Sequence, residues 1–174
     1  SNPKAYLFEI LKLYGFSEWN DVVNLLDAQS GKQVVSKTHR LLKDRDVLIL
    51  TKIKNKKKKE FFIEKGVSEI TDPLHLTFSK INQQNSENKN CIIIDEGKIQ
   101  YPLILRTWEN GDFFCPKGMN GKKKIFKFFK DEKFSLIDKE NTWLLCSRNE
   151  IIWVVGHRQD NRFYPKSSSN SILK

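Results

Sequence analysis

YPLILRTWENGDFFCPKGMNGKKKIFKFFK, residues 101–130, is the stretch that decides the fold of the C-terminal half. Residues 103–108 are rich in β-prone side chains and predict a strand, residues 110–112 (Asn-Gly-Asp) predict a tight turn, and residues 113–114 begin another strand. A loop over 116–121 contains two glycines and leads into a predicted short helix over 122–130.

Two further strands are predicted beyond this stretch, over 142–146 and 151–155, joined by a Ser-Arg-Asn-Glu turn. The order is therefore strand, loop, helix, strand, strand. Such an order predicts a compact α+β domain with a mostly antiparallel sheet and one short basic helix.

The N-terminal residues predict a small helical and β-hairpin part. Apolar side chains recur at helical spacing over 5–14, where Gly15 is expected to end the helix. Ser17 is the expected N-cap of a second helix, whose apolar face comprises Trp19, Val22, Val23 and Leu26. Residues 37–52 predict a hairpin, and its second strand is expected to be buried on both faces because residues 47–50 are all apolar.

Residues 60–81 return to β-like alternation, and residues 82–90 form a polar stretch that predicts a linker. A short strand is predicted over 91–94. We therefore expect two parts, residues 1–97 and residues 98–174.

The net charge of +10 is unevenly distributed along the chain. Residues 1–97 carry 16 basic and 13 acidic side chains, whereas residues 98–174 carry 15 basic and 8 acidic ones. A basic surface attracts polyanions, and nucleic acid is the usual partner. A genome that favours Lys and Asn codons would give the same composition, so charge alone leaves both interpretations open.

Other classes of protein receive little support from the composition. No apolar run approaches the ~20 residues of a membrane span, and no signal peptide is visible. The three cysteines, Cys91, Cys115 and Cys146, are far apart and form no CxxC motif, so we expect no metal site and a reducing cytoplasm. His39 has no Cys or His nearby and is not expected to bind a metal.

The predicted helix over 122–130 carries the main binding hypothesis. At 100° per residue, Ile125, Phe126, Phe128 and Phe129 share one arc that we assign to the core, and Lys123, Lys127 and Lys130 share the opposite arc. A polyanion along that arc would relieve the repulsion between Lys123 and Lys127. The alternatives are a solvated face without a partner, or a binding site at the lysine run 54–59, which is also interpretable as a solvated loop.

Two stretches carry a resemblance to a known family: RTWENGDFFCPKGMNGKKKIFKFFKDEK (106–133) and WLLCSRNEIIWVVGHRQDNRF (143–163). They are similar to the C-terminal domain of bacterial tRNA(Ile)-lysidine synthetases, and residues 5–52 resemble the end of that family's middle, substrate-binding region. The positions that match the family pattern are Arg106, Gly111, Asp112, Phe114, Pro116, Gly118, Gly121, Lys122, Lys123, Asp131, Lys133, Ile151, Trp153, Val154, Gly156 and Arg158.

The resemblance implies a cytoplasmic ligase that uses ATP and magnesium to attach lysine to the wobble cytidine of an isoleucine tRNA. That chemistry belongs to an N-terminal ATP-pyrophosphatase domain with a Ser-Gly-Gly-x-Asp-Ser loop, which this sequence does not contain. We therefore expect the chain to bind tRNA(Ile), with the acceptor stem at its C-terminal domain, and to hold no catalytic residues, cofactor or metal itself. The expected RNA-binding residues are Lys122, Lys123, Lys124, Lys127, Lys130, Arg106, Arg158 and Arg162.

Two rival functions stay open at this point. An unrelated basic RNA- or DNA-binding module would share the basic helix but not the ordered Gly-Asp and Gly-x-Arg pattern. A protein-interaction domain would associate through its apolar strands, for example as a homodimer.

Overall fold

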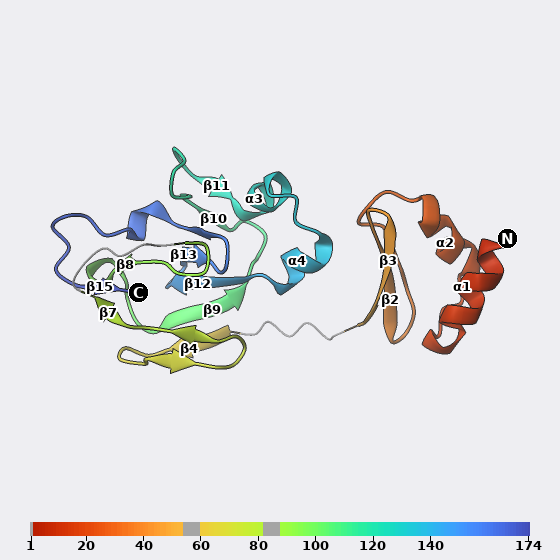
Figure 1. Ribbon diagram of the computed structural model, residues 1–174, viewed down its shortest axis with the longest axis horizontal. Helices are drawn as coiled ribbons and strands as arrows, with labels where there is room; N and C mark the ends of the chain where they lie inside the picture. Colours follow the sequence, from red (N-terminus) through yellow and green to blue (C-terminus); the bar gives the residue numbers. More distant parts are fainter. Residues whose placement is uncertain (1, 54–59, 82–87) are drawn as a thin grey trace. The chain divides into compact units, whose positions relative to one another are not determined.

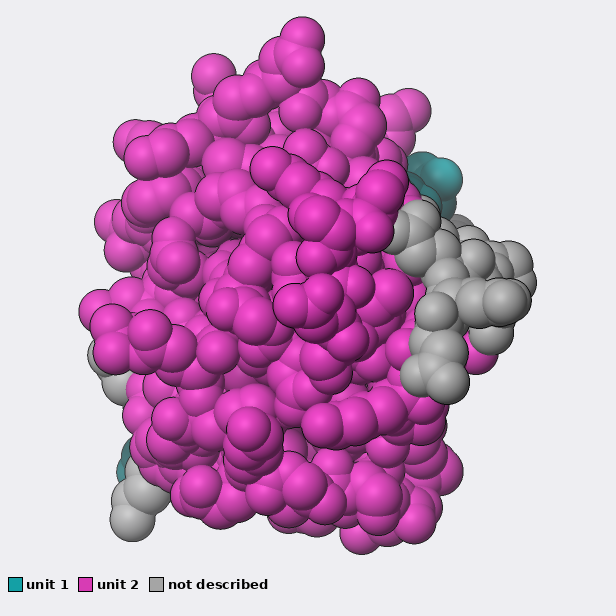
Figure 2. Space-filling view, turned by 90° about the vertical axis from the view of Figure 1, so that its left-hand side faces the viewer, with its two compact units in different colours: residues 1–57 teal, residues 58–174 magenta. Residues whose placement is uncertain are grey.

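The computed structural model describes residues 2–53, 60–81 and 88–174, and the chain divides into two compact units, residues 1–57 and 58–174. The two units are coloured separately in Figure 2. No helix within the described residues is long and apolar enough to cross a membrane.

The N-terminal unit combines two helices with a three-stranded antiparallel sheet (Figure 1). Its elements are α1 (Pro3–Leu11), which continues as a 3-10 turn to Tyr14, α2 (Trp19–Asn24), β1 (Gln33–Val35), β2 (His39–Asp44) and β3 (Val47–Lys52). Gly15 ends the first helix with φ 74°, a left-handed conformation that glycine adopts without a steric penalty. The predicted hairpin over 37–52 is confirmed, since β2 pairs with β3.

Three details of this unit differ from expectation. The residue before α2 is Glu18, not Ser17, and its side chain makes no capping hydrogen bond. Leu25, rather than Leu26, is fully buried beside Val22, because the chain tightens into a 3-10 turn after α2. Strand β3 is only partly buried along its length, so its apolar run does not indicate burial on both faces.

The C-terminal unit begins well before the expected boundary at residue 97. Strand β4 (Glu60–Ile63) pairs with β9 (Leu103–Thr107) at the edge of the main sheet. Strands β7 (Lys80–Ile81) and β8 (Ile94–Asp95) both pair with β15 (Ile172–Leu173). These hydrogen bonds make residues 60–97 part of the C-terminal unit. The hydrophobic pattern of the sequence does not reveal such pairing between distant strands.

The predicted polar linker and the short strand after it lie inside this unit. Residues 82–87 of the linker fall outside the described residues. The strand predicted over 91–94 is an isolated bridge between Asn88 and Cys91, followed by β8. A small ribbon of β5 (Glu69–Ile70) and β6 (Leu76–Thr77) precedes β7.

The central sheet has five antiparallel strands in the order β14-β13-β12-β9-β4. Its remaining strands are β12 (Trp143–Ser147), β13 (Glu150–Val154) and β14 (Arg158–Gln159). The predicted α+β architecture with a mostly antiparallel sheet is confirmed.

Both faces of this sheet are buried. One face presents Leu144, Cys146, Ile151 and Val154 to the aromatic side chains of α3 (Ile125–Asp131). The other presents Leu105, Leu145, Ile152 and Trp153 to residues from the N-terminal and C-terminal ends of the unit. A β-bulge at Ile152, opposite Leu145 and Cys146, lets the adjacent residues Ile152 and Trp153 contribute to the same core, although neighbouring side chains of a regular strand point to opposite faces.

The predicted helix over 122–130 begins three residues later than expected. Strand β10 (Phe113–Phe114) pairs with β11 (Lys123–Lys124), so these two lysines are extended and only residues 125–131 are helical. Figure 1 shows this ribbon running directly into α3.

A second helix, α4 (Leu136–Asn141), follows and was not predicted. Ser135 and Asp138 form a reciprocal capping box at its start. Among its described residues, the C-terminal unit therefore has two short α-helices, α3 and α4, where one was expected.

Candidate nucleic-acid interface

The three consecutive lysines before α3 do not share one environment. Side chains alternate between the two sides of a strand, and Lys123 is paired with Phe114, whose side chain is fully buried. Lys123 therefore turns toward the core and its side chain is only 16% exposed, whereas Lys122 and Lys124 are exposed. The prediction that Lys123 lies on an exposed helical face is wrong.

Lys123 is held by an acidic partner on α3. Its ammonium lies 2.8 Å from Oδ2 of Asp131 and 5.9 Å from the centre of the Phe128 ring. The hydrogen bond from Lys123, followed by the charges of Lys127 and Lys130, lowers the pKa of Asp131. Lys123 therefore joins β11 to the end of α3.

Helix α3 is buried on one side and exposed on the other. Ile125, Phe128 and Phe129 are buried, while Lys127 and Lys130 are exposed as predicted. Phe126 is 56% exposed, so its assignment to the core is wrong. At 100° per residue it lies about 100° from Ile125 and only about 40° from Lys130, on the side that faces solvent.

Four exposed lysines thus remain in the segment that runs through β11 and α3. We call them the lysine cluster: Lys122, Lys124, Lys127 and Lys130. Residues 122–133 contain six lysines and two acidic residues, which leaves a strong local excess of positive charge. Such a surface attracts phosphate groups and raises the local concentration of a polyanion.

Arg106 has an internal partner. Its Nη1 and Nη2 atoms each donate to a different carboxylate oxygen of Asp112 at 2.8 Å, and Nη1 also donates to the carbonyl of Thr107 at 3.0 Å. Both ion-pair partners have side chains only 13% exposed. Asp112 is therefore the ion-pair partner of Arg106, and it leaves that guanidinium few free donors.

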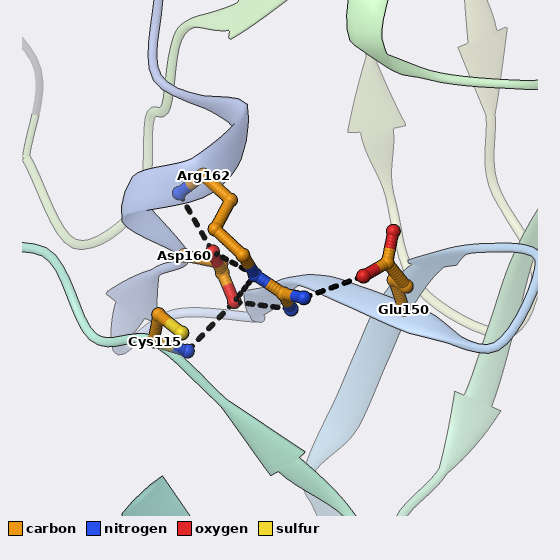
Figure 3. A network of polar contacts seen from close by, with 4 residues as sticks. All are labelled: Cys115, Glu150, Asp160 and Arg162. Carbon is orange, nitrogen blue, oxygen red and sulfur yellow. Dashed lines mark hydrogen bonds and ion pairs between the residues drawn. The ribbon is translucent and has the colours of Figure 1, made fainter. Parts of the chain in front are cut away.

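Arg162 is likewise engaged inside the domain (Figure 3). Its Nε donates to both carboxylate oxygens of Asp160, and its Nη1 contacts Glu150. Asp160 is completely buried and also accepts from the backbone N–H of Cys115 at 2.7 Å. Arg162 therefore neutralises a buried carboxylate that joins β14 to the strand-and-loop segment after β10.

Arg158 is more accessible than the other two arginines. Its Nη1 donates to the carbonyl of Lys117 at 3.2 Å, and its Nη2 lies 3.9 Å from Glu132. The side chain is 42% exposed. Of the three expected arginines, Arg158 is the one whose surroundings are compatible with an additional phosphate contact.

Lys139 is a basic residue near α3 that is not among the RNA-binding residues expected from the sequence. It lies on α4, and its ammonium is 5.6 Å from the centre of the Phe126 ring. The Ser-x-x-Asp spacing at 135–138 is a helix-start signal that identifies α4 from sequence.

The lysine run 54–59, the alternative binding site, lies outside the described residues.

The described residues contain no group of three or more His, Cys, Asp or Glu side chains placed to hold a metal ion. His157 packs on the Phe134 ring at 4.5 Å beside an open groove of about 620 Å³, and burial lowers its pKa. Burial raises the pKa of Cys146 to about 12, as expected for a cysteine that serves as a core residue.

Known proteins resemble both units of the chain. The family model of the TilS substrate binding domain matches residues 1–53, and that of the TilS substrate C-terminal domain matches residues 103–172. The chain is 45% identical over 179 residues to the tRNA(Ile)-lysidine synthase of Parabacteroides distasonis, and 37% identical over 175 residues to that of Bacteroides thetaiotaomicron. Both alignments cover 98% of this chain, but only 40% and 39% of those relatives.

A solved structure agrees with the family matches at the level of the fold. The chain is similar to a crystal structure of the TILS C-terminal domain, with a TM-score of 0.55 and 21% sequence identity. The similarity covers 66% of this chain and 94% of that one. Since both matched domains are TilS domains, the chain belongs to the tRNA(Ile)-lysidine synthase family and corresponds to its C-terminal part.

Proposed function

We propose that this chain is the tRNA-binding C-terminal part of a tRNA(Ile)-lysidine synthase, and that the lysine cluster contacts RNA phosphates. One observation carries the proposal. Lys122, Lys124, Lys127 and Lys130 are exposed on the surface of the C-terminal unit, whereas Lys123, Arg106 and Arg162 are held by carboxylates. The exposed cations are the ones free to meet a phosphate backbone.

The chemistry of paired RNA fits such a surface. The major groove of an RNA stem is deep and narrow, so side chains read mostly its phosphates and 2′-hydroxyls. Lysines on a short ribbon and helix can follow a phosphate backbone without reading base edges. We propose that the stem is the acceptor stem of an isoleucine tRNA, in line with the family resemblance, and that Arg158 adds a contact at the margin of the cluster.

The proposed parent reaction is the ATP-dependent attachment of lysine to the wobble cytidine. The chain spans about 40% of the length of the relatives it matches, and it contains no Ser-Gly-Gly-x-Asp-Ser loop. We propose that ATP and magnesium bind in the part of such proteins that lies outside this chain. The 174-residue chain by itself should then bind tRNA without forming lysidine.

A competition experiment tests this function. The purified chain is bound to a labelled tRNA(Ile), and unlabelled tRNA(Ile), another tRNA and a DNA duplex of similar length are added as competitors. We expect the two tRNAs to compete within about tenfold of each other, and DNA to compete less well because the B-form backbone has a different shape. A strong preference for tRNA(Ile), or equal competition by DNA, would argue against shape-based recognition of an RNA stem.

A further inference from the structure

Phe126 is an exposed aromatic ring within the most basic segment of the C-terminal unit. The ring is 56% exposed, although phenylalanine is usually buried. On α3 it precedes Lys130 by four residues, a spacing that places two side chains next to each other on a helix surface. From α4, the ammonium of Lys139 lies 5.6 Å from the ring centre.

Phe113 repeats this arrangement on the neighbouring ribbon. Its ring is 42% exposed, and the ammonium of Lys122 lies 4.7 Å from the ring centre. Phe113 is paired with Lys124 across β10 and β11. Each of the two exposed rings therefore has a lysine ammonium over its face, Lys139 at Phe126 and Lys122 at Phe113. A lysine of the cluster also lies beside each ring, Lys130 at Phe126 and Lys124 at Phe113.

We propose that Phe126 is a stacking platform for an unpaired nucleotide, and that the chain prefers RNA in which a single-stranded nucleotide adjoins a stem. This inference rests on the proposed function, because it assigns a second kind of contact to the same surface. The lysine cluster holds the phosphates of the stem, and the ring takes a base that has left the stack.

The combination of ring and ammonium is suited to one nucleotide. A base stacked on the ring replaces water over an apolar surface and is accepted whatever its identity, because every base has a π-face. In the absence of RNA, the ammonium of Lys139 is attracted to the face of the Phe126 ring. When a base occupies that face, the ammonium can contact the phosphate of the same nucleotide instead. Paired bases inside a stem have both faces covered and offer no such contact.

The experiment uses two RNA hairpins with the same stem, one blunt and one with a short single-stranded 3′ extension. The first unpaired nucleotide of the extension is 2-aminopurine, whose fluorescence falls when it stacks on an aromatic ring. Wild-type chain should bind the extended hairpin more tightly and quench its fluorescence. Phe126→Leu should weaken that binding about fivefold or more, as expected for ~1 kcal/mol or more per stacked base, and leave blunt-hairpin binding unchanged.

Two further variants separate stacking from general damage. Phe126→Trp keeps an aromatic ring and should retain the preference and the quenching. Phe62→Leu, at a ring that is 61% exposed on the edge strand β4, should change neither hairpin's affinity. The melting temperatures of all three variants should stay near that of the wild type, because both rings are largely exposed.

The possible outcomes distinguish this inference from the function on which it rests. Failure of the wild-type chain to bind either hairpin would reject the proposed function itself. Equal binding of both hairpins, unaffected by Phe126→Leu, would leave phosphate binding in place and overturn the stacking role. Loss of affinity for both hairpins to the same extent in Phe126→Leu would also overturn it, since a stacking platform acts only on the unpaired nucleotide.

Discussion

Arg106 on β9 and Asp112 in the turn before β10 form a two-pronged ion pair, in which two guanidinium nitrogens each lie 2.8 Å from a different carboxylate oxygen. Asp112 also accepts a hydrogen bond from the backbone N–H of Glu109 at 2.7 Å. The pair therefore fixes the turn that leads into the β10–β11 ribbon, and with it the direction in which Lys122 and Lys124 leave the surface.

Removing the charge of Asp112 should destabilise the domain without a direct effect on phosphate contacts. Asp112→Asn leaves a largely buried guanidinium short of its partner, so we expect a loss of about 2–3 kcal/mol in the free energy of unfolding. Arg106→Lys keeps the charge but loses the two-pronged geometry and should also lower stability. Urea unfolding measures both variants; unchanged stability together with weakened RNA binding would instead assign Arg106 to the interface.

Asp160 should matter more to stability than the other acidic partner of Arg162. Its carboxylate is completely buried and accepts from Arg162 and from the backbone of Cys115, whereas the side chain of Glu150 is 59% exposed. We expect Asp160→Asn to cost about 3–5 kcal/mol and Glu150→Gln less than 1 kcal/mol. Thermal or urea unfolding decides the order, and equal effects of the two variants would contradict the role given to the buried carboxylate.

The contact between Lys123 and Asp131 predicts a specific pH effect. Because the hydrogen bond from Lys123 lowers the pKa of Asp131 below its ordinary value of 3.8, the pair stabilises the fold above that value. This contribution is lost as the pH falls through the lower pKa of the folded state, when the carboxylate takes up a proton. In Lys123→Met, an NMR titration of the Asp131 carboxyl carbon should give a higher pKa than in the wild type.

Lys124→Met is the matched control for that titration. Lys124 is the other residue of β11, but its side chain lies on the opposite side of the ribbon from Lys123. Its substitution should move the pKa of Asp131 much less. A pKa that is the same in the wild type and in Lys123→Met would mean that Lys123 is free in solution and available to RNA.

Much of the C-terminal architecture follows from local patterns. The strands at β9, β12 and β13 and the turns between them were predicted because each is a short β-prone run bounded by turn residues. The N-terminal hairpin was predicted for the same reason. The pairing of β4 with β9 was not predicted, because hydrogen bonds between strands about 40 residues apart leave no periodic signal in either strand.

The two errors at the candidate site, at Lys123 and at Phe126, have different physical origins. Helical periodicity predicts a helix from Lys122 onward, but the pairing of β11 with Phe113 and Phe114 holds Lys123 and Lys124 in an extended conformation. In a strand Lys123 points to the opposite side from its two neighbours, so it meets Asp131 rather than solvent. The four apolar residues of α3 predict one shared arc, but Ile125, Phe128 and Phe129 alone cover the sheet, and Phe126 is left exposed to solvent.

The dependence of tRNA affinity on salt tests the central claim most directly. Each lysine that contacts a phosphate releases a counterion, so the slope of log K against log salt concentration changes by roughly 0.7–0.9 per contact. The test variant replaces the lysine cluster with alanine at Lys122, Lys124, Lys127 and Lys130. The control variant removes the same charge from exposed lysines elsewhere in the unit, at Lys65, Lys89, Lys166 and Lys174.

The two variants have the same net charge, so they differ only in where the charge was removed. We predict that the cluster variant lowers the magnitude of the slope by roughly 3, while the control variant keeps nearly the wild-type slope and both retain the wild-type melting temperature. Equal slopes in the two variants would contradict the account, since the affinity would then depend on net charge and not on the lysine cluster.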